Sequence, residues 1–252
     1  MDMALFVDVS RWSVFRGLIG FFEEKLGVTP SYIQVCGRRD PNLDQCIINN
    51  IDNLKGRLCD GIPELGIPSG NPYTFDELLI TDGPNAKIYI RDAKIMGMCD
   101  FVVKSFYADI DRLHFEAEII FKQVEINTTY DFNVRLLVPI AYKGPIYLTL
   151  DNVGAKADID INLTTRDSKR YVYLSKLKIN IDFKNYNIKY DVDNSDLAQF
   201  YEIIKNFVGN NREEIIKILK PVIEAEISRR IILISNNIVK QFTYEELFPD
   251  RT

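Results

Sequence analysis

The feature that most constrains the fold is a long stretch, residues 73–192, in which apolar and polar residues alternate. From Leu113 to Phe121, and again from Tyr130 to Ile140, nearly every second residue is apolar. Successive side chains of a β-strand point to opposite faces, so this pattern predicts strands with one dry and one wet face. The runs exceed the usual strand length of about five or six residues. We therefore expect a large, strongly curved antiparallel sheet.

The alternation changes phase within residues 146–163. Ile146 and Leu150 occupy even positions of the dry face, whereas Ala155 and Ile161 occupy odd ones. A shift of one residue turns every later side chain to the other face of a sheet. The phase change therefore predicts a β-bulge at residues 152–154.

Two segments with helical periodicity flank the strands. Residues 40–60 carry apolar side chains at helical spacing and open on Asp40-Pro41, a common helix start. Helical spacing returns at residues 195–242, with an interruption at Gly209-Asn210 where we expect a hinge. Pro221 predicts a kink in this second helix, and its wide apolar band predicts that it is mostly buried.

The order of these segments defines the fold class. Strands follow one another instead of alternating with helices, which excludes a doubly wound parallel fold. We expect an α+β fold in which a highly curved antiparallel β-sheet wraps a long C-terminal helix.

Composition and motifs exclude several function classes. The 252 residues have a net charge of -5, which argues against nucleic acids and anionic membranes. No apolar run reaches the ~20 residues that a membrane span needs. The single histidine, His114, shares the wet phase of its strand with Glu116 and Glu118, so we expect a solvated histidine and solubilising charges. No nucleophile elbow or phosphate loop accompanies them, so we expect no enzyme, metal or cofactor.

Three separated motifs follow one another along the chain. Tyr32-Ile33 leads to Cys36 and Cys46, Gly61-Ile-Pro-Glu-Leu-Gly-Ile-Pro68 forms a connector, and a helix containing Lys220-Pro221 precedes Leu247-Phe248-Pro249. In this order they resemble the insect takeout and juvenile-hormone-binding-protein family. The resemblance covers residues 30–250, which we expect to form one lipid-carrier domain, and leaves residues 1–29 outside it.

The resemblance implies both fold and function. Its tubular lipid-binding fold holds a long helix inside the curved sheet and leaves an apolar tunnel. Members are secreted carriers of terpenoid hormones or similar lipids, which implies an extracellular monomer without cofactors, with a small apolar ligand and a receptor or carrier protein as partners. It also implies a disulfide between Cys36 and Cys46. Cys59 and Cys99 lie outside that pair, and both a second disulfide and two small apolar core residues stay open.

The N-terminal segment and two sequons bear on whether the chain is secreted. Residues 1–29 are apolar, but Asp2, Asp8, Arg11 and Arg16 interrupt them, and a secretory signal needs an unbroken apolar centre. An atypical leader and a short amphipathic helix both stay open. Asn127 and Asn162 begin glycosylation sequons, which matter only if the chain enters the secretory route.

Ligand-binding candidates come from the dry faces and from the resemblance. Core packing explains any one of the aromatic residues, but as a set they can line a tunnel, with Tyr130 and Tyr142 offering hydroxyls to a ligand oxygen. We expect the ligand to enter where the N-terminal segment, residues 61–68 and the C-terminal helix meet. The predicted ligand-binding residues are Tyr32, Ile33, Val35, Leu65, Phe115, Phe121, Tyr130, Phe132, Leu136, Val138, Tyr142, Phe200, Ile204, Phe207 and Leu219.

Two other functions stay open. In a protein-interaction module, the interior would be filled by the protein's own side chains; small dry-face residues such as Ala117, Ala155 and Ala157 favour spare room instead. A lipid esterase is the least favoured function, because no nucleophile–base pair is present.

Overall fold

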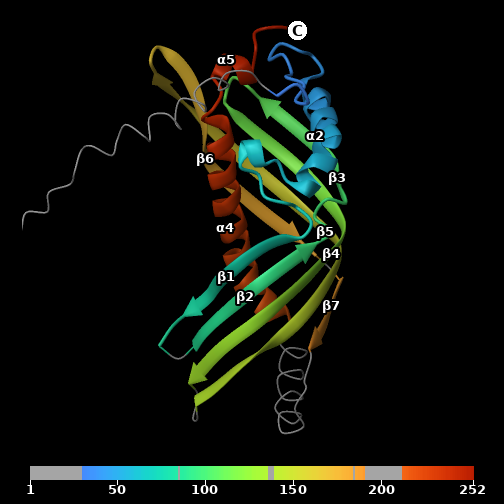
Figure 1. Cartoon of the computed structure of the whole chain (residues 1–252), viewed down its shortest axis with the longest axis vertical. Helices are drawn as coiled ribbons and strands as arrows, with labels where there is room; N and C mark the ends of the chain where they lie inside the picture. Colours follow the sequence, from blue (N-terminus) through green and yellow to red (C-terminus); the bar gives the residue numbers. More distant parts are fainter. Residues whose placement is uncertain (1–29, 85, 136–138, 184, 191–211) are drawn as a thin grey trace, which may run out of the picture.

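The computed structural model describes residues 30–84, 86–135, 139–183, 185–190 and 212–252. One elongated body results, with helix α4 running along its length and helices α2 and α5 at one end (Figure 1). The elements in chain order are α2 (Leu43–Asp60), the 3-10 helix η2 (Pro63–Leu65), β1 (Tyr73–Asp82), β2 (Ala86–Met96), β3 (Phe101–Asp109), β4 (His114–Arg135), β5 (Pro139–Arg166), β6 (Lys169–Asp182), β7 (Asn185–Tyr190), α4 (Arg212–Val239) and α5 (Tyr244–Leu247).

The seven strands form one antiparallel sheet, which confirms the predicted α+β fold. Its order is β1-β2-β4-β5-β6, with β3 added to β4 and β7 added to β5. The long β4–β5 hairpin is the spine, and each of its strands has two outer neighbours in succession. β4 pairs first with β3 and then with β2, whereas β5 pairs first with β7 and then with β6. Within the described residues the sheet does not close: β1 and β3 lie along one edge, and β6 and β7 lie along the other.

The predicted bulge at residues 152–154 is wrong in form, although the change of phase is confirmed. Asn152 has a positive φ of 52°, yet β4 and β5 keep one register from His114↔Asp160 to Arg135↔Pro139. The inward-facing side chains change phase in both strands at the same level. In β4 they change from odd positions such as Phe115 to even ones such as Val124, and in β5 from even positions such as Ile146 to odd ones such as Val153. A kink shared by two paired strands changes the phase without shifting their register, and the sheet bends there.

Helix α2 begins three residues later than predicted, at Leu43. The reason is local: the Asp40 carboxylate accepts a hydrogen bond from the Asn42 backbone N–H at 2.8 Å, which makes a turn before the helix. The predicted end at Asp60 is confirmed. Gly61 follows with a φ of 89°, and a Cβ there would lie 2.9 Å from the Ser69 nitrogen, so the chain turn requires glycine.

The buried clusters lie at the end of the molecule that holds α5. One joins Phe115, Ile161, Val172 and Tyr244, and so links β4, β5, β6 and α5. The connector at residues 61–68 contributes the other, in which Ile62 and Leu65 pack with Phe242.

Helix α4 continues through Pro221, but the prediction that it is mostly buried is wrong for its described residues. Ile218, Ile231 and Leu233 are 60%, 39% and 52% exposed. The apolar band is wider than the side of the helix that the sheet covers. Among the described residues, no helix is both long and apolar enough to cross a membrane. The predicted hinge at Gly209-Asn210 lies outside the described residues.

Candidate ligand pocket between helix α4 and strand β6

Side chains of α4 satisfy the open edge of β6 in place of another strand. The Asn236 side chain accepts a hydrogen bond from the Leu174 N–H at 2.7 Å and donates one to the Leu174 carbonyl at 3.1 Å. Further along, the Glu224 carboxylate accepts a hydrogen bond from the Ile181 N–H at 2.7 Å. These bonds hold α4 along an edge whose backbone groups would otherwise need water or another chain.

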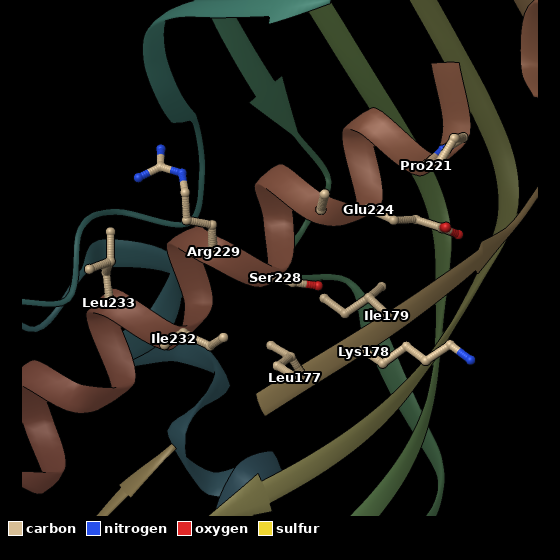
Figure 2. Close-up of a pocket in the computed structure, with 10 residues that line it drawn as sticks. Leu177, Lys178, Ile179, Pro221, Glu224, Ser228, Arg229, Ile232 and Leu233 are labelled. Atoms are coloured by element: carbon tan, nitrogen blue, oxygen red, sulfur yellow. The ribbon is translucent and has the colours of Figure 1, made fainter. Parts of the chain in front are cut away.

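A pocket of about 560 Å³ lies between these two attachment points and is open to solvent. Figure 2 shows side chains from α4 and β6 around it, with Leu177, Ile179 and Ile232 extending between the two elements. The volume falls within the range of ~300–1,000 Å³ that is typical of small-molecule sites. The residues that line it are Leu177, Lys178, Ile179, Pro221, Glu224, Ala225, Ser228, Arg229, Ile232 and Leu233.

Few polar groups face this mostly apolar space. Ser228 is 9% exposed and is the one buried polar residue in the described part of the chain. Figure 2 shows its hydroxyl directed from α4 toward Ile179. Glu224 lies at the pocket with a side chain that is 16% exposed, 3.7 Å from the Lys220 ammonium.

Arg229, which lies at the rim of the pocket, is paired with Glu226 outside it. Arg229 donates two hydrogen bonds to Glu226, at 2.6 and 2.7 Å, and its guanidinium points away from the pocket (Figure 2). These bonds, together with one from Arg230, hold the pKa of Glu226 below its usual value against the effect of burial. Arg230 also lies over the Phe75 ring of β1 at 5.0 Å, so α4 contacts one strand at each edge of the sheet.

The structure brings the N-terminal candidates together at the α5 end. Ile33 and Tyr32 pack on the cluster that contains Leu65. The Tyr32 hydroxyl donates a hydrogen bond to Glu64 at 2.8 Å, and the Arg57 guanidinium lies 4.3 Å from the Tyr32 ring centre. The Val35 carbonyl accepts a hydrogen bond from Arg251. These groups have protein partners that hold this end of the molecule together, and their predicted contact with a ligand stays a prediction.

The aromatic candidates fall into two places along the spine. Phe115 is 6% exposed and stacks on Phe248 with ring centres 6.0 Å apart, and Phe121 lies 6.0 Å from Phe101. The rings of Tyr130, Phe132 and Tyr142 gather nearer the other end of β4 and β5, with centres 5.6–6.4 Å apart. Gly144 makes room for them, because a Cβ there would lie 3.0 Å from Tyr142 Cε1 and 3.3 Å from the Tyr130 hydroxyl.

The remaining candidates do not form a described site. Leu219 is half-buried on α4, outside the pocket. Leu136, Val138, Phe200, Ile204 and Phe207 lie outside the described residues.

Sequence reasoning missed the pocket residues Ser228, Glu224 and Ile232. A signal for them exists, because they are four residues apart and therefore share one face of the helix. A serine and a glutamate on an otherwise apolar helix face mark a contact that apolar periodicity alone does not explain.

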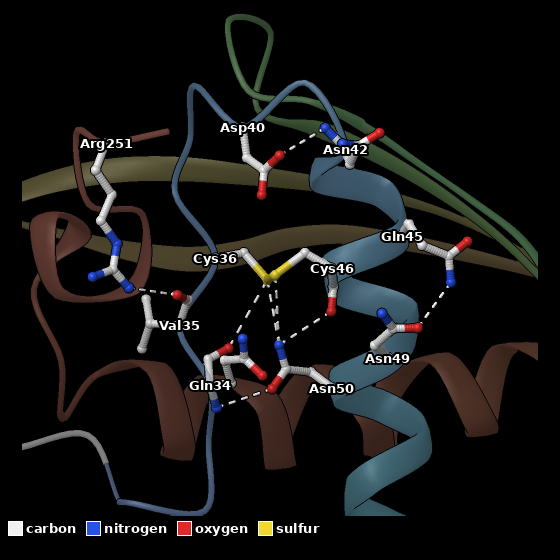
Figure 3. Close-up of a disulfide and its surroundings, with 10 residues drawn as sticks. All are labelled: Gln34, Val35, Cys36, Asp40, Asn42, Gln45, Cys46, Asn49, Asn50 and Arg251. Carbon is white, nitrogen blue, oxygen red and sulfur yellow. Dashed lines mark hydrogen bonds between the residues drawn. A yellow bond between two sulfur atoms is a disulfide. The ribbon is translucent and has the colours of Figure 1, made fainter.

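Both disulfides are formed. Cys36 and Cys46, with Cα atoms 6.0 Å apart, join the N-terminal segment to α2, as the resemblance implied. Asn50 sits beside them and binds the Gln34 N–H at 2.9 Å and the Cys46 carbonyl at 3.1 Å (Figure 3). Cys59 and Cys99 are also bonded, which settles the alternative left open by the sequence.

His114 lies on the outer face of the sheet, but it is not simply solvated. Its Nδ1 is 2.7 Å from Asp160 of β5, and its Nε2 is 3.5 Å from Glu116. Glu118 faces Lys156 at 3.5 Å. The charges on this face therefore pair across neighbouring strands.

Comparisons with known proteins place this geometry. The model of the family described as haemolymph juvenile hormone binding protein matches residues 17–249. No curated protein sequence matches. The structure is similar to takeout 1 of Epiphyas postvittana, with a TM-score of 0.68 and 17% identity, over 86% of this chain and 100% of that chain. Lipopolysaccharide binding protein shares 9% identity with this chain, over 76% of this chain and 38% of that one. Its TM-score of 0.36 is too low to indicate a shared fold.

A curved antiparallel sheet that carries a long helix along its open edge defines the class: this is a takeout-type fold. The chain belongs to the haemolymph juvenile hormone binding protein family.

Proposed function

We propose that the protein is a secreted, non-enzymatic carrier that holds a small hydrophobic ligand between helix α4 and the sheet. The ligand is a terpenoid of the juvenile-hormone kind or a fatty-acid-like lipid. The observation that carries this proposal is the open, apolar pocket between α4 and β6 in a chain of this family. Family membership also weighs against the protein-interaction module and the lipid esterase.

Magnitudes support a carrier. A ligand that buries ~400 Å² of apolar surface gains ~10 kcal/mol at ~25 cal/mol/Å². Association costs about 4 kcal/mol or more. Affinities from nanomolar to micromolar follow without any ion pair.

The proposal extends to the surrounding features. The aromatic cluster of Tyr130, Phe132 and Tyr142 would form a second stretch of ligand-contacting wall, and the ligand would enter at the α5 end. Two disulfides support passage through an oxidising compartment, where Asn127 and Asn162 could be glycosylated. Residues 30–250 would act as one monomeric carrier domain.

Native mass spectrometry of protein purified from its natural source tests the function. We expect a co-purified small molecule that is released on denaturation and extracts into organic solvent. Protein free of any ligand, together with no binding of juvenile hormone or fatty acids by calorimetry, would contradict it.

A further inference from the structure

We propose that Ser228 is the polar recognition group of the α4–β6 pocket, and that the pocket receives a neutral oxygen of the ligand, as in an alcohol, ester or ketone, in preference to a free carboxylate. This inference rests on the proposed carrier function and narrows its ligand class.

The Ser228 hydroxyl is placed to contact a ligand in the pocket. Ser228 is 9% exposed and its hydroxyl is directed from α4 toward β6 (Figure 2). Within the described part of the chain, no hydrogen bond of this hydroxyl is found, although the backbone of the same helix is close. Every side-chain nitrogen or oxygen of these described residues that is fully shielded from solvent has a hydrogen-bond partner. The Ser228 hydroxyl has none, so it is not fully shielded and borders the pocket space.

The side chains around Ser228 offer its hydroxyl no hydrogen-bond partner. Leu177, Ile179 and Ile232 make the surroundings apolar. The open pocket gives this hydroxyl access to solvent, but a ligand that fills the pocket would exclude that solvent, and a hydroxyl left without a partner is unfavourable. A ligand oxygen inside the pocket would replace the excluded solvent as a hydrogen-bond partner, whereas an alkyl chain would leave the hydroxyl without one.

The charged groups around the pocket are poorly placed to bind a ligand carboxylate. Glu224 presents a carboxylate that is already bound to the Ile181 N–H and lies near Lys220. Arg229 is held by Glu226 and points away. Lys178 is exposed and alternates with the inward-facing Leu177 and Ile179, so its side chain starts from the opposite face of β6.

A charged ligand end would therefore be poorly placed. A desolvated carboxylate needs a cation or several donors, and here it would meet another carboxylate. A neutral oxygen needs only one donor, which Ser228 provides.

The test compares Ser228→Ala with the wild-type protein by displacement of the neutral fluorophore N-phenyl-1-naphthylamine. The competitors share one chain length: tetradecanol, methyl tetradecanoate, tetradecanoate and tetradecane. We expect the substitution to weaken binding of the alcohol and the ester by about three- to tenfold and not to weaken binding of the hydrocarbon, which makes no hydrogen bond with the hydroxyl. The wild-type protein should bind the ester more tightly than the carboxylate.

Two further variants separate recognition from structure. Ser228→Thr keeps the hydroxyl and should retain alcohol and ester binding. Ser175→Ala removes a hydroxyl from the exposed face of β6 and should change nothing. Thermal unfolding of each variant checks that the fold is kept.

The outcomes distinguish the two proposals. If the wild-type protein binds none of the four compounds nor the fluorophore, the carrier function itself fails. If it binds them, but Ser228→Ala weakens all four equally or none, the role of Ser228 is overturned. Tighter binding of tetradecanoate than of its ester overturns the preference for a neutral oxygen.

Discussion

His114 links two strands of the spine through a charge that depends on pH. Its hydrogen bond to Asp160 is the largest cause that raises the pKa of His114, and Glu116 adds to it. The bond also lowers the pKa of Asp160. A raised histidine pKa means that the folded state binds a proton more tightly than the unfolded chain does. The stabilisation is therefore complete below the unfolded pKa of about 6.5 and disappears as pH rises through the higher folded-state pKa.

The substitution His114→Gln tests this at the scale of one residue. We expect the wild-type protein to exceed the variant in melting temperature at pH 6, and the difference to shrink as pH rises through the folded-state value. The effect should be small, because the histidine is partly exposed. Glu118→Gln, which removes a pair with Lys156 on the same face, serves as the control. A difference that is constant from pH 6 to pH 9 would contradict the assignment.

At the scale of elements, the two disulfides should differ in their contribution to stability. They close loops with sequence separations of 10 and 40 residues. The chain-entropy relation gives about 2.7 kcal/mol for the shorter loop and about 3.9 kcal/mol for the longer one. Urea unfolding of Cys36→Ala/Cys46→Ala and of Cys59→Ala/Cys99→Ala should show a larger loss for the second pair. The reverse order would show that the loop lengths do not govern these contributions.

The attachment of α4 to β6 gives a second prediction for elements. Asn236→Ala removes two hydrogen bonds to Leu174 and leaves edge backbone groups without their partner. We expect a loss of about 1–3 kcal/mol and faster amide hydrogen exchange at Leu174. Asn237→Ala is the matched control, because Asn237 is exposed and binds Lys240. Unchanged exchange at Leu174 would mean that Asn236 does not hold the edge.

The elements themselves were largely predictable, for physical reasons. Alternation over residues 73–192 indicated the sheet, because strand side chains have a period of two residues whatever the neighbours are. The shared kink was not predictable, since it depends on how β4 and β5 pair. The start of α2 was misplaced because a side-chain bond of Asp40 makes a turn where the sequence allows a helix.

At the scale of the whole molecule, the site was harder to predict than the fold. Dry-face aromatic residues such as Phe115 belong to the packed α5 end, where alternation cannot separate core from cavity. The pocket arises instead where α4 meets the edge of β6, and this contact joins segments far apart in sequence. The spacing of four residues shows that Ser228 and Glu224 share one helix face, but the sequence does not show which element that face meets.

Filling the pocket should separate binding from folding. We expect Ala225→Trp to leave the melting temperature of the free protein nearly unchanged, because Ala225 is exposed and the pocket has room. Ligand at 100 times its dissociation constant stabilises a protein by about 2.7 kcal/mol, and this increment should be lost in the variant. Ile218→Trp, at a position of α4 that is 60% exposed, should keep it. An unchanged ligand-induced shift in Ala225→Trp would place the ligand elsewhere.

The matched kink of β4 and β5 constrains how relatives of this chain can vary in length. Removing one residue near Gln123 alone would turn the side chains from Val124 onward toward water, while those of β5 stayed in place. Removing a partner residue near Asp151 at the same time would turn the paired side chains of both strands to the same face again. Insertions and deletions at this level should therefore occur as compensating pairs on the two strands, and a lineage with a change on only one of them would have to rebuild half of the sheet.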